Sequence, residues 1–150
     1  MELSAPQEDY LETIGHLCRE NGAARVSEIA ARHGVSTATV VGALRSLKQR
    51  NLLCQPPYGQ ITLTSEGQAA AESVMARHAA LHAFLVGVLG VDGPTAERDA
   101  CRIEHDVSPA TLRRLIALER FLARGPWADV DWRGEFERFL ATEEQQGATG

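Results

Sequence analysis

Residues 25–53, RVSEIAARHGVSTATVVGALRSLKQRNLL, decide the fold of the first part of this 150-residue chain. The stretch holds two short segments with the apolar spacing of a helix, separated by Gly34, which we expect to end the first segment. Ser27 is predicted to cap the first helix, and Ser36 or Thr37 the second, which should reach about residue 51. The apolar residues predicted to pack together are Ile29, Ala30, Val35, Val40 and Leu44. Two short helices joined by a tight glycine-containing turn match the helix-turn-helix pattern.

The segments on either side extend this motif. Upstream, Ser4 and Pro6 predict a capped helix that ends near residue 21. Downstream, LLCQPPYGQITLT (residues 52–64) holds two short β-prone runs around a Pro-Pro-Tyr-Gly turn, which predicts a hairpin. Helix, helix-turn-helix and hairpin together predict a winged helix. A plain helical hairpin without a role in DNA binding is the alternative.

The charge distribution favours a DNA-binding winged helix over the plain helical hairpin. The net charge of −5 is unfavourable for binding nucleic acid, but residues 25–50 carry five basic side chains against Glu28 alone. A basic patch on an acidic body is compatible with local phosphate contact, and the acidic remainder raises the hypothesis of a bound cation. Residues 36–39 open the second helix and are best placed for base edges and nearby phosphates. The candidate DNA contacts are Ser27, Ser36, Thr37, Ala38, Thr39, Arg45, Lys48, Arg50 and, on the wing, Tyr58.

The cysteines and the hydropathy of the sequence indicate the cellular compartment to expect. The three cysteines, Cys18, Cys54 and Cys101, are odd in number and widely spaced, which argues against a disulfide framework and for a reducing compartment. The N-terminus lacks the pattern of a signal peptide, and no window approaches the roughly 18 apolar residues of a membrane span. We therefore expect a cytoplasmic protein that does not associate with membranes.

The second half of the sequence is predicted to be helical throughout. A long helix should run from a cap at Ser65 to about residue 89, and Pro94 should open another, PTAERDACRIEHD. Ser108 caps a third predicted helix, a fourth begins near Asp131, and residues 143–150 are expected to be disordered. The fold class is thus mainly α, with a winged helix-turn-helix over residues 1–64 and an all-helical domain over residues 65–142.

Candidate metal ligands lie on three predicted helices. On a helix, Cys101, Glu104 and His105 would share one face. The first helix offers Asp9 and Glu12, the long helix offers His78 and His82, and Glu97 lies one turn before Cys101. Each pair alone also fits an ordinary solvated face or a buried cysteine. Together, carboxylates, imidazoles and a thiolate can supply about five or six ligands, which suits Mn²⁺ or Fe²⁺ better than a closed tetrahedral zinc site.

Four stretches carry a resemblance to a known family: PQEDYLETI, RVSEIAARHGVSTATVVGALRSL, ITLTSEGQAAAESVMARHAALHAFL and ACRIEHDVSPATLRRL. In this order and spacing they are similar to the metal-dependent repressors typified by the diphtheria toxin repressor and the manganese transport regulator. The resemblance covers residues 5–120. It implies a homodimer with an N-terminal winged helix and a helical domain for metal binding and dimerisation, in the short, two-domain architecture of the manganese-type members.

The resemblance also implies a ligand set. Asp9 and Glu12 match the first-helix carboxylates of manganese-type members, and Cys101 agrees with the iron-type ACRWEH motif. His78, Glu104 and His105 match both branches. His82 and Glu97 occupy positions of iron-type ligands, so a second site of altered composition is implied. This hybrid set leads us to expect Mn²⁺ or Fe²⁺, with Zn²⁺ or Co²⁺ able to substitute.

The function implied is a metal-activated homodimeric repressor that binds palindromic operator DNA and controls metal-uptake genes, without an organic cofactor. Gly42 stands where iron-type members have a longer polar residue, which indicates an altered operator. A metal-independent or redox-sensing winged-helix regulator is the alternative. A metalloenzyme is a third hypothesis, which the sequence supports little because it offers no separate acid/base pair.

Overall fold

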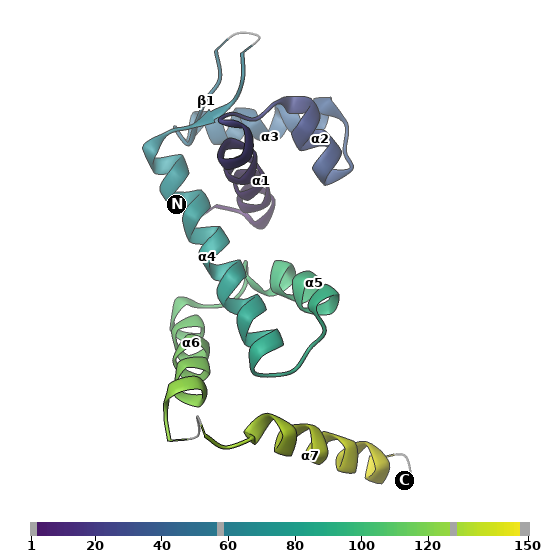
Figure 1. Cartoon of the computed structure of the whole chain (residues 1–150). Helices are drawn as coiled ribbons and strands as arrows, with labels where there is room; N and C mark the ends of the chain where they lie inside the picture. The colour runs from purple at the N-terminus through teal and green to yellow at the C-terminus, as the bar shows by residue number, and fades with distance from the viewer. Residues whose placement is uncertain (1–2, 57–58, 127–128, 148–150) are drawn as a thin grey trace. The chain divides into compact units, whose positions relative to one another are not determined.

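The computed structural model describes residues 3–56, 59–126 and 129–147. The chain divides into two compact units, Met1–Arg77 and His78–Gly150, and each is treated below by itself (Figure 1). The division falls inside one long helix, α4 (Ser65–Gly87). No helix of the described residues is long and apolar enough to cross a membrane.

The first unit is a winged helix-turn-helix, as predicted. Its helices are α1 (Ala5–Asn21), α2 (Val26–His33) and α3 (Thr37–Gln49). Strands β1 (Leu53–Cys54) and β2 (Thr62–Leu63) pair antiparallel, with Leu53 opposite Leu63. A further antiparallel bridge joins Ala24 to Ile61, so the base of the hairpin is also tied to the segment before α2. Pro57 and Tyr58 lie outside the described residues.

The turn between α2 and α3 is built from local hydrogen bonds. Gly34 has a φ of +63°, a left-handed conformation that glycine adopts without the steric cost of a side chain. The Ser36 hydroxyl accepts a 3.2 Å hydrogen bond from the Thr39 backbone N–H, so Ser36 is the cap of α3. The prediction that Ser27 caps α2 is wrong. That helix already begins at Val26, and the Glu28 carboxylate accepts the Arg25 backbone N–H at 2.9 Å.

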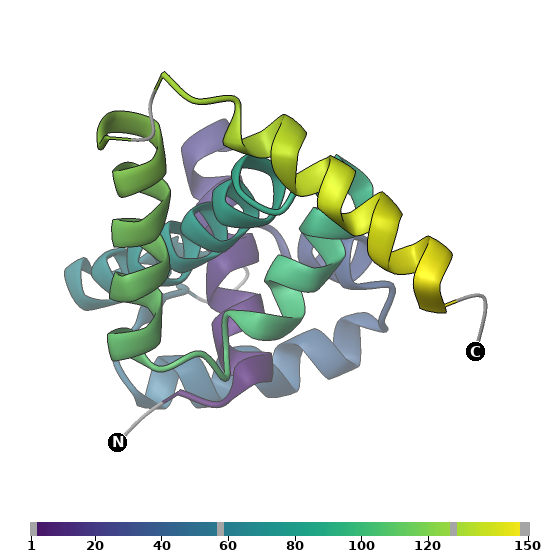
Figure 2. The ribbon, with the colours of Figure 1, turned by 90° about the horizontal axis from the view of Figure 1, so that it is seen from below.

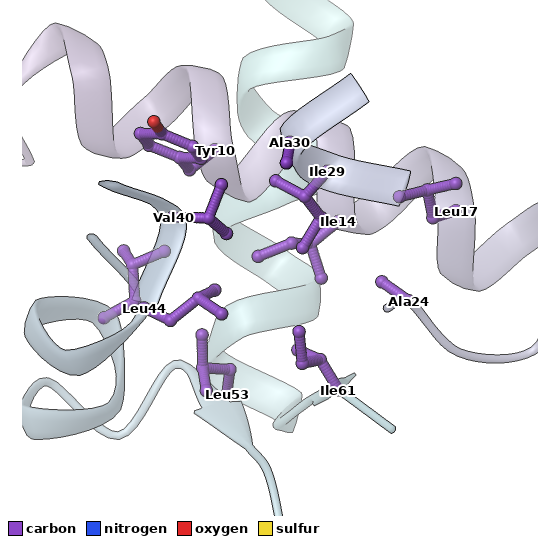
Figure 3. Close-up of a cluster of buried hydrophobic side chains, with 11 residues drawn as sticks. Tyr10, Ile14, Leu17, Ala24, Ile29, Ala30, Val40, Leu44, Leu53 and Ile61 are labelled. Atoms are coloured by element: carbon purple, nitrogen blue, oxygen red, sulfur yellow. The ribbon is translucent and has the colours of Figure 1, made fainter. Parts of the chain in front are cut away.

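The core of the first unit lies where α1, α2, α3 and the hairpin converge (Figure 3). Tyr10 and Ile14 come from α1, Ile29 from α2, Val40 from α3 and Ile61 from the hairpin. Helical spacing of apolar residues on each helix therefore produces one shared interior. The prediction that Val35 belongs to this core is wrong, because Val35 lies in the turn and is 37% exposed.

The first half of α4 packs closely against the winged helix within the same unit. Leu11, Ala71 and Met75 form a second buried cluster. A Cβ atom added at Gly67 would lie only 1.7 Å from the carbonyl oxygen of Leu52, so no side chain fits there. The start of α4 also differs from the prediction: Ser65 is its first helical residue, and the Thr64 hydroxyl accepts the Gly67 backbone N–H at 3.0 Å.

An ion pair joins α1 to α4 beside this cluster. Arg77 Nη2 lies 2.7 Å from Glu8 Oε1, and the two side chains are 26% and 15% exposed. Among the described residues, the buried Nε and Nη2 atoms of Arg77 make no hydrogen bond of good geometry, so the contact is chiefly electrostatic. A cation and an anion that are both largely removed from water depend on each other for compensation.

The second unit contains the end of α4 followed by α5 (Gly93–Ile103), α6 (Pro109–Arg124) and α7 (Trp132–Gly147). Figure 2 shows α6 in green and α7 in yellow as two separate rods that run in different directions. Leu81 and Phe84 of α4 are buried, as are Ala96 and Ala100 of α5. The mainly helical fold class is confirmed.

Two predicted features of the second unit differ from the structure. Helix α5 is capped by Asp92, whose Oδ1 accepts the Thr95 backbone N–H at 3.0 Å, and it ends at Ile103. Glu104 and His105 therefore follow the helix instead of extending it. Helix α7 continues to Gly147, so residues 143–147 are helical where disorder was expected. Glutamate and glutamine are good helix formers, and their propensity outweighs the low hydrophobicity of this segment.

Candidate metal centre and nucleic-acid interface

The His78 ring on α4 lies between two groups of candidate ligands in the second unit. Its Nδ1 atom is 2.8 Å from Glu104 Oε2 and 3.8 Å from the Cys101 sulfur. Glu104 is 1% exposed, and its other oxygen lies 3.6 Å from His105 Nε2. The segment after the end of α5 thus places a buried carboxylate between two imidazoles, a thiol being close by. Cys101, Glu104 and His105, predicted from spacing on one helix, do gather on this side.

The opposite nitrogen of His78 faces the second group. His78 Nε2 is 3.2 Å from Glu97 Oε2, and His82 Nε2 is 3.9 Å from the same oxygen. The rings of His78 and His82 stack at a centroid distance of 6.4 Å, as expected for residues one helical turn apart. The predicted second group, His82 and Glu97, therefore also lies next to His78.

The surroundings of His78 determine its protonation. Burial lowers the pKa of His78, but hydrogen bonds to Glu97 and Glu104 and the charge of both carboxylates raise it more, so the net pKa lies above the ordinary 6.5. In the absence of a cation, the two carboxylates thus favour the imidazolium form of His78 over the neutral ring.

The donor set fits a divalent transition metal. One ligand atom each from His78, Glu97 and Cys101 lie within 4.8 Å of one another. Donors that are about 2.0–2.3 Å from a common ion are at most about 4.6 Å apart, so this cluster needs only a small adjustment to share one. Imidazole, carboxylate and thiolate are the ligand types that iron, cobalt and zinc accept, and the carboxylates extend the range toward manganese.

The first-helix candidates lie in the other unit. Asp9 and Glu12 are half-buried on α1, and Glu12 Oε1 is 3.8 Å from His16 Nε2. Tyr10 and Leu11, which adjoin Asp9, are buried and hold this part of α1 in the interior. That Asp9 and Glu12 join the ligands of the second unit remains a prediction.

The predicted DNA-contacting residues line the exposed side of α3 and its surroundings. The buried residues Val40, Leu44 and Leu47 set the inner face of α3. The outer face of the helix and its cap expose Ser36, Thr37, Ala38, Thr39, Arg45 and Lys48, while Ser27 is exposed on α2 and Arg50 is partly exposed after α3. Several of these side chains already have partners; for example, the Ser36 and Thr39 hydroxyl oxygens lie 2.9 Å apart. Ser36 caps the helix, and Lys48 Nζ donates to the Gln55 carbonyl at 3.2 Å.

One exposed residue of α3, Val41, was not among the DNA contacts predicted from the sequence. Val41 is 47% exposed and follows Thr37 by one helical turn. The i, i+4 spacing from Thr37 was a signal for its position, but an apolar residue was not expected to be a contact.

Two successive stretches of the chain match known domain families. Residues 2–61 match the model of the iron dependent repressor N-terminal DNA binding domain, and residues 64–133 match that of the iron dependent repressor metal binding and dimerisation domain. The chain belongs to the iron-dependent repressor family. The expectation of a regulator in place of an enzyme is thereby confirmed, because the relatives whose role is known are transcriptional regulators.

Individual relatives of the chain support the assignment. The chain is 43% identical over 105 residues to the transcriptional regulator MntR of Escherichia coli, covering 70% of this chain and 67% of the relative. An HTH-type transcriptional regulator of Methanocaldococcus jannaschii is 34% identical over 121 residues, covering 79% and 97%. A manganese-dependent transcriptional repressor solved in complex with manganese is 32% identical, with a TM-score of 0.69 over 80% of this chain. The chain described here spans about 55% of the length of that solved protein.

Proposed function

We propose that the repressor is a cytoplasmic homodimer that binds palindromic operator DNA when it holds a divalent metal ion, and that it controls genes for metal uptake. One observation carries the proposal: a chain with a DNA-binding winged helix also gathers His78, Glu97 and Cys101 within 4.8 Å in its metal-binding domain. Two solved relatives, a manganese regulator and a manganese-dependent transcriptional repressor, support a metal ion as the signal.

The proposed ligands are Asp9, Glu12, His78, Cys101, Glu104 and His105, with His82 and Glu97 as a second set. Mn²⁺ or Fe²⁺ is the proposed ion, and Zn²⁺ or Co²⁺ are expected to substitute because the set includes a thiol. When bound, the ion supplies positive charge that compensates the carboxylates of both sets. His78 must then release the proton that its raised pKa retains, so metal affinity should rise with pH.

The role proposed for Asp9 and Glu12 links metal to DNA. Both lie on α1 of the winged helix, whereas the remaining ligands belong to the second unit. Without a cation, the carboxylates repel one another and favour many orientations of the two units. Shared coordination restricts those orientations and favours the one in which paired α3 helices fit successive major grooves about 34 Å apart. A hundredfold gain in DNA affinity requires about 2.7 kcal/mol of coupling.

The test is a fluorescence-anisotropy titration of promoter DNA with the full-length protein in EDTA, Mn²⁺, Fe²⁺, Co²⁺ or Zn²⁺. We expect tight binding with at least one ion and at least tenfold weaker binding in EDTA. Glu104→Ala and His105→Ala should abolish the metal response, whereas Glu119→Ala, a half-buried α6 carboxylate outside the ligand set, should retain it. Equal DNA affinity with and without ions would contradict the proposal. If Cys101→Ser then altered only the response to peroxide, the redox-sensing alternative would be favoured.

A further inference from the structure

The outer face of α3 carries unusually small side chains. Because Val40, Leu44 and Leu47 are buried, the opposite side of the helix is exposed, and its first two turns present Thr37, Ala38, Val41 and Gly42. Residues 37–42 include no amide, carboxylate, lysine or arginine. This part of the helix cannot make the bidentate hydrogen bonds by which side chains distinguish guanine or adenine.

Val41 gives this surface an apolar character. Val41 is 47% exposed. At an exposed helix position, alanine or a long polar residue would favour the helix more than valine does. Of the groups at base edges in the major groove, the apolar one is the 5-methyl group of thymine. An exposed valine at this position has the chemistry to contact that methyl group.

The charge around this surface indicates which partner covers it. Arg45 follows Val41 by one helical turn, and Lys48 lies a further turn along the same side. Cations beside a small apolar patch match a groove with phosphates on its walls and methyl groups on its floor. A protein partner would be expected to cover a larger apolar area than one valine. The occupant we argue for is therefore the major groove of duplex DNA.

Gly42 adds a second, independent observation. A Cβ atom added there would meet nothing within 4 Å, and the residue is in the interior of a regular helix. The fold therefore does not require glycine, which instead costs the helix roughly 1 kcal/mol relative to alanine. A missing side chain on the outer face allows the backbone of α3 to approach a partner closely.

We infer that Val41 reads thymine methyl groups in the operator and that Gly42 provides the space for α3 to reach them. The inference rests on the proposed function, in which α3 enters the major groove. It names the feature of the DNA that the repressor recognises: thymine at defined positions of each half-site, in place of a hydrogen-bonded guanine or adenine.

The experiment uses the full-length protein with Mn²⁺, and it is repeated with Fe²⁺, Co²⁺ and Zn²⁺ if no duplex is bound. Duplexes are selected from a random pool, and each thymine of the best duplex is then replaced by deoxyuridine, which lacks only the methyl group. We expect one thymine per half-site at which the replacement weakens binding about fourfold, the value for one buried methyl group. For Val41→Ala, affinity should be lower and the thymine and uracil duplexes should bind equally. Val35→Ala, an exposed valine in the preceding turn, should retain the difference.

Gly42→Ala provides a second measurement with opposite signs for stability and binding. The variant should unfold at a higher temperature, because alanine favours the helix, yet bind the selected duplex several-fold more weakly. The inference is overturned if wild type binds uracil and thymine duplexes equally, if Val41→Ala keeps the difference, or if Gly42→Ala binds like wild type. If no duplex is bound in the presence of any metal, the proposed function itself is wrong.

Discussion

The Glu8–Arg77 ion pair should stabilise the first unit more than an exposed ion pair does. The two side chains are 15% and 26% exposed and their charged atoms are 2.7 Å apart. Exposed pairs are worth about 0–1 kcal/mol, whereas removing one partner of a buried pair costs about 3–5 kcal/mol. For this half-buried pair we expect each of Glu8→Gln and Arg77→Met to lower the free energy of unfolding by about 2 kcal/mol, with a coupling energy of about 1 kcal/mol.

The measurement is a double-mutant cycle by urea unfolding in EDTA, followed by circular dichroism at 222 nm. The matched control is the Glu20–Arg32 pair, which has a similar separation of 2.6 Å but side chains 51% and 41% exposed. Its coupling energy should be below about 0.5 kcal/mol and should fall further in 1 M salt. A Glu8–Arg77 coupling no larger than that of the control would refute the argument that burial strengthens this contact.

Three further predictions concern stability and protonation. In EDTA, the contribution of His78 to stability should be fully present below about pH 6.5 and should be lost as pH rises through its raised folded pKa. Urea unfolding from pH 5.5 to 8.5 should therefore show a free energy of unfolding that falls with pH. The variant His78→Gln should remove this pH dependence. Gly67→Ala should lower the free energy of unfolding by at least about 3 kcal/mol or prevent folding, because its Cβ would lie 1.7 Å from the Leu52 carbonyl oxygen. Thermal unfolding like that of wild type would contradict this expectation. Ser36→Ala should lower stability by about 1 kcal/mol through loss of the α3 cap, and Ser36→Asp should restore most of it in the same assay.

Sequence patterns predicted the winged helix because its signals are local. Helical spacing, the glycine at position 34 and the serine at position 36 act within a few residues of where they stand. The position of Val35 was not predictable in the same way. Its exposure depends on how α2 and α3 pack, and its apolar side chain alone gives no indication of that.

For the candidate metal site, the sequence predicted which side chains of the second unit lie close together, but not their geometry. Helical spacing correctly indicated that Cys101, Glu104 and His105 lie near one another. The sequence IEHD contains no helix breaker, however, so the end of α5 at Ile103 could not be foreseen. The partly buried contact between Glu104 and His78 joins residues 26 positions apart, and only the tertiary structure establishes such a contact.

The location of one imidazole between two sets of donors has a consequence for the order in which ions bind. A neutral ring has a single lone pair to give, and its other nitrogen then carries a hydrogen. If Nδ1 bonds a cation beside Cys101 and Glu104, the Nε2 hydrogen points at Glu97, and the ring is lost to the second set. An ion on the Nδ1 side of the ring and an ion on the Nε2 side therefore compete for the same lone pair, so the two positions are competitors as well as neighbours.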